Sequence, residues 1–170
     1  MDKRGLSAAA IGAVVAAGLA GTAAGAGLVA FFGDRWGRRR VLLALSALGL
    51  LGGLGLAWGQ GPWTLAALAF LGMVNGMGHD RGGAYALEQS ALSGARSVGE
   101  RTKTFAAYHA VGDAGAALGS LAAALVGVLG YHTLWLGYAA AMGAGLILYP
   151  ALSAAVESSS GHAALSPVSA

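Results

Sequence analysis

The sequence contains no cysteine, few prolines and few charges, and each shortage excludes a class of protein. Without cysteine there can be no disulfide bonds and no thiolate metal sites. Only 3 of the 170 residues are proline, so the 30 glycines do not indicate a disordered chain. Charged residues make up 10% of the sequence, against about 25% in soluble domains. A soluble fold of this composition would lack the polar surface to cover itself, so we expect a protein that lies in a lipid bilayer.

The sequence also lacks the patterns of enzymes and of nucleic-acid-binding proteins. It has no phosphate-binding Walker loop, no H-E-x-x-H zinc motif and no cysteine nucleophile. Its basic residues form a compact cluster only between Arg35 and Arg40, and apolar runs flank that cluster on both sides. We therefore expect no enzyme activity, no cofactor, no metal site and no nucleic-acid partner.

Apolar residues make up 56% of the chain, and the mean hydropathy is +0.67. They fall into five runs, each near the roughly 20 helical residues that cross a bilayer. We therefore predict an all-α integral membrane protein with about five transmembrane helices in residues 1–153. The expected spans are 8–32, 41–59, 63–83, 104–129 and 133–153, with room for the third helix to continue to 92. Residues 154–170 are rich in Ser and Ala, which predicts a flexible cytoplasmic tail or the remnant of a linker.

Turn residues and basic residues predict how these helices connect. Pro62 follows a short polar stretch, which is typical of the first turn of a helix. The connections at 60–62 and 130–132 carry no Lys or Arg, whereas the alternate connections are basic. Basic connections favour the cytoplasmic side. The connections expected on the cytoplasmic side carry Arg35, Arg38, Arg39, Arg40, Arg96, Arg101 and Lys103. Lys3 and Arg4 then fall on the opposite side, which a preceding helix would explain.

Three pairs of glycines are spaced four residues apart. Small residues at this spacing line one face of a helix and allow close helix packing in membranes. The pairs are Gly21 with Gly25, Gly72 with Gly76, and Gly115 with Gly119. They predict a tightly packed bundle and do not identify a site.

Ionisable residues inside the expected spans are candidates for a substrate or proton pathway, because burying them in lipid is costly. The third span carries His79, Asp80 and Arg81, and the fourth carries Asp113. At 1.5 Å per residue, Arg81 and Asp113 lie about 16 Å and about 13 Å from the cytoplasmic helix ends. We therefore predict that the two pair or that both face an aqueous cavity. The alternative is that the glycines near residue 80 break the helix and leave residues 79–81 at the membrane surface.

Two further polar residues belong to this candidate pathway. His109 precedes Asp113 by one helical turn, so the two share a face. Packing or an interfacial position is the simpler explanation for this histidine, and proton handling is the alternative. Asn75 either forms a hydrogen bond between helices or lines the pathway, and the former is favoured.

The stretch from Asp34 to Arg40 resembles motif A of the major facilitator superfamily, the D-R-x-G-R-R signature between helices 2 and 3 of these transporters. The resemblance rests on Asp34, Arg35, Gly37, Arg38 and Arg39, and Ala30 replaces the leading glycine. It implies that this stretch, with Glu88 as a charge partner, is a conformational latch on the cytoplasmic side. The alternative is that the arginines only orient the protein, which leaves Asp34 and Gly37 unexplained.

The resemblance covers nearly the whole chain. It implies that the five expected spans correspond to helices 2 to 6 of the N-terminal half, which is an incomplete helical bundle of this family. Helix 1 and the second half are absent, and 112–124 lacks the Gly-Pro pair of the antiporter signature. The resemblance implies a secondary active transporter fragment in a cell membrane, with the bacterial inner membrane as the expected location. It would move a small solute by alternating access. Coupling to a proton or ion stays open at this point, and so does the need for a missing second half or a partner chain. The alternative is a small membrane scaffold or interaction protein without transport activity.

Overall fold

The computed structural model describes residues 6–74, 84–85, 87–89, 92 and 98–151. Within these ranges the chain is all helical apart from short turns, so the predicted all-α bundle is confirmed. Residues 84–85, 87–89 and 92 are helical as well. The helices are α1 (Ala8–Trp36), α2 (Arg38–Trp58), α3 (Pro62–Leu71), α5 (Val98–Ala124), α6 (Val126–Leu148) and the 3₁₀ helix η1 (Tyr149–Ala151).

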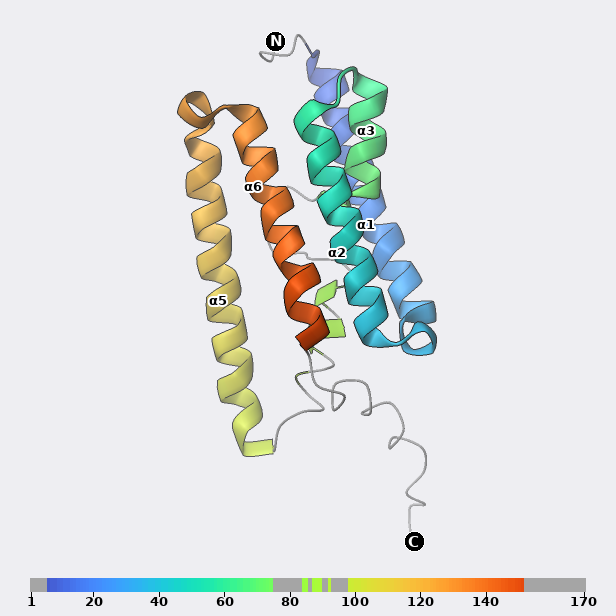
Figure 1. Cartoon of the computed structure of the whole chain (residues 1–170), viewed down its shortest axis with the longest axis vertical. Coiled ribbons are helices and arrows are strands. Elements are labelled where there is room, and N and C mark those ends of the chain that lie inside the picture. The colour runs from blue at the N-terminus through green and yellow to red at the C-terminus, as the bar shows by residue number, and fades with distance from the viewer. Residues whose placement is uncertain (1–5, 75–83, 86, 90–91, 93–97, 152–170) are drawn as a thin grey trace, which may run out of the picture.

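The helices alternate in direction along the bundle (Figure 1). α1, α2 and α3 pack together, α6 lies against α2, and α5 forms the outer edge beyond α6. The α1–α2 turn, the start of α5 and the end of α6 lie at one end of the bundle. The α2–α3 and α5–α6 turns lie at the other end. The two basic regions of the described chain therefore share one end, which we call the basic end.

Among the described residues, three helices are long and apolar enough to cross a membrane, namely Ala8–Gly33, Arg38–Trp58 and Val126–Ala151. α5 has 27 residues and is about 40 Å long, but its charged residues lower its hydropathy. It begins at Val98 and ends at Ala124, whereas the sequence predicted a span over 104–129. The earlier start arises because charged residues such as Arg101 and Lys103 are good helix formers and extend the helix beyond its apolar part.

A glycine with positive φ lies at each of three sharp changes of direction in the described chain. Gly37, Gly61 and Gly130 have φ of 83°, 78° and 78°, which side chains rarely tolerate. Gly61 directly precedes Pro62, which begins α3 as predicted. Gly130 lies within α6 and separates a single first turn from the long part of that helix. The change of direction after α5 thus takes place at the predicted turn, although helical residues lie on both sides of it.

The third helix ends earlier than the sequence predicted. α3 stops at Leu71, and Met73 follows in the left-handed conformation at φ 50°. The Met73 amide donates to the Phe70 carbonyl at 3.1 Å, and the Val74 amide donates to the Ala69 carbonyl at 3.0 Å. These two bonds form a Schellman motif, which closes the helix. α3 therefore ends short of residue 83, where the sequence predicted the end of the third span, and residues 75–83 lie outside the described residues.

α1 and the end of α3 make backbone contact through small residues. A Cβ atom at Gly18 would lie 2.1 Å from the Val74 carbonyl oxygen, and one at Gly21 would lie 2.0 Å from that of Phe70. Thr22, next to Gly21, is 5% exposed. Its hydroxyl lies 3.1 Å from the Met73 carbonyl oxygen and 3.0 Å from that of Gly18. This face of α1 therefore fits the Schellman turn only because it lacks side-chain bulk.

The other predicted glycine pairs behave differently. Gly72 caps α3, and a Cβ there would lie 2.9 Å from the Gly52 Cα of α2. Gly76 lies outside the described residues. No described atom comes within 4 Å of a Cβ at Gly115 or Gly119, so this pair does not mediate packing in the described part of the structure. The small-residue rule is therefore borne out on α1 and not on α5.

Candidate functional site

The chain reverses between α1 and α2 at one residue. α1 ends at Trp36 and α2 begins at Arg38, with Gly37 between them at φ 83° and ψ 127°. The Val41 amide donates to the Gly37 carbonyl at 3.2 Å and begins the hydrogen bonding of α2. The turn therefore depends on glycine, and it places the two halves of the D-R-x-G-R-R stretch on antiparallel helices.

The arginines of this turn occupy helix ends with opposite electrostatic preferences. Arg35 lies in the last turn of α1, where the helix dipole favours a cation. Arg38, Arg39 and Arg40 form the first turn of α2, where the dipole disfavours one. Arg38 and Arg39 are half-buried and Arg40 is exposed. The backbone of Asp34 is helical, and its side chain lies outside the described part of the structure. The three arginines of α2 thus point to interactions with anionic groups.

A small apolar core lies under the turn. Val29 of α1 and Val41 and Leu42 of α2 are buried together with Leu87 from the helical stretch at 87–89. Leu42 is the most deeply buried of them, at 1% exposed. Gly33 of α1 lies beside this stretch, since a Cβ there would make an ordinary contact with the Leu87 side chain at 3.4 Å. The segment next to Glu88 is thereby anchored against the basic turn.

Glu88 joins three parts of the chain that are distant in sequence. Its carboxylate accepts a hydrogen bond from the Tyr108 hydroxyl of α5. It accepts a second one, at 2.5 Å, from the Tyr149 hydroxyl of η1. The Tyr85 ring lies 6.0 Å from that of Tyr108, centre to centre, and extends the cluster. The structure therefore connects Glu88 to tyrosines that the sequence did not single out, and its role as charge partner of the arginines stays a prediction.

The predicted pathway residues are only partly described. Asn75, His79, Asp80 and Arg81 lie outside the described residues, so the Arg81–Asp113 pairing stays a prediction. Asp113 is exposed on α5. His109 is also exposed, one turn earlier, with its ring 6.1 Å from that of Tyr85. The structure therefore places His109 at the edge of the tyrosine cluster.

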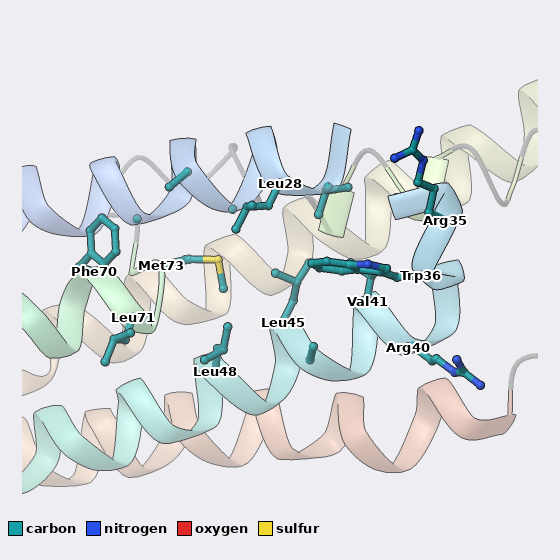
Figure 2. Close-up of a pocket in the computed structure, with 15 residues that line it drawn as sticks. Leu28, Arg35, Trp36, Arg40, Val41, Leu45, Leu48, Phe70, Leu71 and Met73 are labelled. Atoms are coloured by element: carbon teal, nitrogen blue, oxygen red, sulfur yellow. The ribbon is translucent and has the colours of Figure 1, made fainter. Parts of the chain in front are cut away.

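A cleft of about 600 Å³ opens between α1 and α2, and sequence reasoning did not predict it. Leu28 of α1 and Leu45 and Leu48 of α2 line its walls (Figure 2). Phe70, Leu71 and Met73, at the Schellman turn, line one end. The Trp36 ring extends into the opposite end, where Arg35 and Arg40 are found. Apolar residues spaced three and four apart on α2 give a sequence signal for the walls. Nothing in the sequence indicates that the two helices splay apart.

The described residues contain no group of three His, Asp or Glu residues that could hold a metal ion. The site therefore consists of a basic turn, a tyrosine–carboxylate cluster and an apolar cleft.

Comparisons with known proteins agree with the motif. The family model of the Major Facilitator Superfamily matches residues 1–168. The chain is also similar to the uncharacterized membrane protein YJR124C of Saccharomyces cerevisiae, with 28% identity over 111 residues. That match covers 65% of this chain and 25% of the yeast protein, so the chain spans only about a quarter of this curated relative. No solved structure matches the chain. Because the family model matches nearly the whole sequence, the chain belongs to the Major Facilitator Superfamily.

Proposed function

We propose that this chain is part of a secondary active transporter that moves a small solute across a cell membrane by alternating access. Membership of the family over residues 1–168 carries this proposal. Drugs, sugars, nucleosides and organic anions are all candidate solutes, and proton or ion coupling is part of the proposal. A second helical bundle, in the same chain or a partner chain, would complete the solute cavity, because such sites lie between repeats.

The proposed mechanism places the conformational switch at the basic end of the bundle. The latch comprises Glu88 and the motif residues Asp34, Arg35, Gly37, Arg38 and Arg39. Support comes from Leu87, which is buried against Val41 and Leu42, and from Glu88, which is hydrogen-bonded to two other elements. Opening this end would require these bonds to break together, and such bonds are individually weak enough to exchange. The switch is thus a set of short-range contacts around one carboxylate.

The orientation and the pathway are further parts of the proposal. Because Arg35 to Arg40 and the first turns of α5 lie at the same end, the positive-inside rule favours that end in the cytoplasm. The solute or proton pathway would use Asp113 and His109 of α5, together with Asn75, His79, Asp80 and Arg81. A bacterial inner membrane is the expected location.

The latch can be tested without knowing the solute, because the chain has no cysteine of its own. Cysteine is introduced at Ala84, which packs against the core under the turn. Its labelling by a membrane-impermeant maleimide is then measured in inverted vesicles. Removing the carboxylate charge with Glu88→Gln should raise the labelling rate severalfold, because the closed basic end is weakened. Tyr85→Phe, which keeps the neighbouring ring, is the matched control and should leave the rate unchanged.

Transport itself needs a separate assay. The full gene and this chain are expressed in cells, and accumulation of glucose, uridine, lactate and the fluorescent cation ethidium is compared with an empty vector. We expect gradient-dependent movement of at least one of these probes by the full gene. Equal labelling of the Glu88→Gln and parent proteins, with no movement of any probe, would contradict the proposed function.

A further inference from the structure

We propose that the cleft between α1 and α2 binds one anionic phospholipid, with an acyl chain along the cleft and the phosphate at Arg35 and Arg40. This site depends on the membrane location and not on transport. It shares Arg35 with the proposed latch, and Val29, Val41 and Leu45 with the core under the turn. It differs from the latch at Arg40 and along the rest of the cleft, which take no part in the hydrogen bonds to Glu88. The occupant follows from the size of the cleft, its polarity and its charge.

The dimensions of the cleft suit a lipid chain. Its volume of about 600 Å³ lies within the range of about 300–1,000 Å³ that is typical of small-molecule pockets. Along α1 it extends from Gly21 to Arg35, a distance of about 21 Å at 1.5 Å per residue. One leaflet of hydrocarbon is about 15 Å thick. A cleft of this length therefore holds an extended acyl chain with the headgroup at the arginines.

The lining of the cleft changes along its length from apolar at the far end to basic at the near end. Leu28, Leu48 and Phe70 line the middle and the far end, and they remain 53%, 39% and 42% exposed. Arg35 and Arg40 lie at the near end, one from each helix, and their side chains extend to opposite sides of the Trp36 ring (Figure 2). Both side chains are exposed, so either can turn toward a headgroup. The Trp36 ring lies between the arginines and the apolar walls, and tryptophan is enriched at the headgroup level of membranes. An amphiphile with an apolar tail and an anionic head matches this gradient.

Charge selects a phospholipid over the other possible occupants. Arg40 lies in the first turn of α2, where the helix dipole disfavours it, so a nearby phosphate would stabilise the turn. Guanidinium groups bind phosphate oxygens in a forked geometry, which gives strong hydrogen bonds. A free phosphate would use the arginines and leave the apolar walls without a role. A packed apolar helix would cover the walls and leave the arginines without an anion.

The experiment is lipid retention by the full chain, purified in detergent and measured by native mass spectrometry. The probes are phosphatidylglycerol, phosphatidylcholine and the chain-free headgroup glycerol phosphate. The parent protein should retain one phosphatidylglycerol and bind phosphatidylcholine and glycerol phosphate at least about tenfold more weakly. The double variant Arg35→Gln/Arg40→Gln should lose about tenfold in phosphatidylglycerol affinity.

Two further variants separate the parts of the site. Arg39→Gln removes one charge from the same turn without touching the cleft and should leave phosphatidylglycerol retention within twofold of the parent. Ala44→Phe fills the cleft from α2 and should reduce retention with both arginines intact. Circular dichroism and the gel-filtration profile establish that each variant is folded. Equal retention of the two lipids, binding of glycerol phosphate as tight as that of the lipid, or an unchanged Ala44→Phe variant would each overturn the proposal.

Discussion

Replacing Gly21 by alanine tests the tightest helix contact in the described structure. A Cβ atom at this position would lie 2.0 Å from the Phe70 carbonyl oxygen, 2.8 Å from its carbonyl carbon and 2.9 Å from its Cα. All three are backbone atoms, so no side-chain rotation relieves the clash. Real Cβ contacts are almost never shorter than 3.0 Å. α1 and α3 must therefore separate by about 1 Å, which forfeits roughly a quarter to a half of the dispersion attraction across the contact.

The magnitude follows from a comparison with two other glycines of α1. Overpacking of this kind costs about 1–3 kcal/mol, and an exposed helical Gly→Ala change gains about 0.5–1 kcal/mol. No described atom comes within 4 Å of a Cβ at Gly27, so Gly27→Ala carries the propensity gain alone. At Gly25 the Cβ would meet the Met73 sulfur at 2.6 Å, and this flexible side chain can move away. The difference between Gly21→Ala and Gly27→Ala therefore isolates the clash, and Gly25→Ala should lie between them.

The assay is thermal unfolding in detergent, followed by the intrinsic fluorescence of the four tryptophans. For a chain of this size, 1 kcal/mol shifts Tm by about 2–4 °C, so Tm of Gly21→Ala should lie roughly 2–12 °C below that of Gly27→Ala. Adding Phe70→Ala should not rescue Gly21→Ala, because the clash involves the backbone of residue 70. If Gly21→Ala melted at or above Gly27→Ala, the close approach of α1 to the Schellman turn would be refuted.

Three further changes address the turn, the buried hydroxyl and the carboxylate cluster in the same Tm assay. Gly37→Ala should lower Tm by several degrees, because alanine is strained at φ 83°, and an unchanged Tm would contradict that turn geometry. Thr22→Val should lower Tm by about 2–4 °C and Thr22→Ser by less, because serine keeps the hydroxyl that bonds the Met73 carbonyl. Tyr149→Phe should cost about 1.5–3 kcal/mol, since it removes a hydrogen bond to a charged carboxylate, whereas Tyr85→Phe should leave Tm nearly unchanged. Equal effects of the two tyrosine changes would argue against the Glu88 cluster.

The turns and long helices were predictable because their signals are local. Gly37, Gly61 and Gly130 lie at points where apolar runs meet, and each adopts a conformation that glycine alone adopts readily. Pro62 marked the start of α3, since it needs no amide donor there. The end of α3 carried no such signal. Met73 takes the left-handed position that glycine usually occupies, and the hydroxyl of Thr22, 51 residues earlier, holds its carbonyl.

The candidate site was predictable only where its residues are adjacent in sequence. The D-R-x-G-R-R stretch is continuous, so its turn and its arginines could be identified together. Glu88 could be identified from the sequence, but its hydrogen-bond donors are 20 and 61 residues away. Nothing in the sequence distinguishes these two tyrosines from the other three. The cleft depends on the angle between α1 and α2, which is set by contacts at both ends and by no single residue.

The two ends of the cleft between α1 and α2 connect the packing of the bundle to the proposed lipid site. At one end Gly21 and Gly25 hold α1 on the Schellman turn, and at the other Gly37 joins α1 directly to α2. The cleft therefore lies between the contact of α1 with the Schellman turn and the glycine turn, and the arginines lie beside that turn. A phosphate at Arg35 and Arg40 would bridge α1 and α2 next to the turn that the latch would have to move. Lipid binding and the switching of the basic end would then act on the same short segment. A change in lipid binding should therefore alter the switching, and a change in the switching should alter lipid binding.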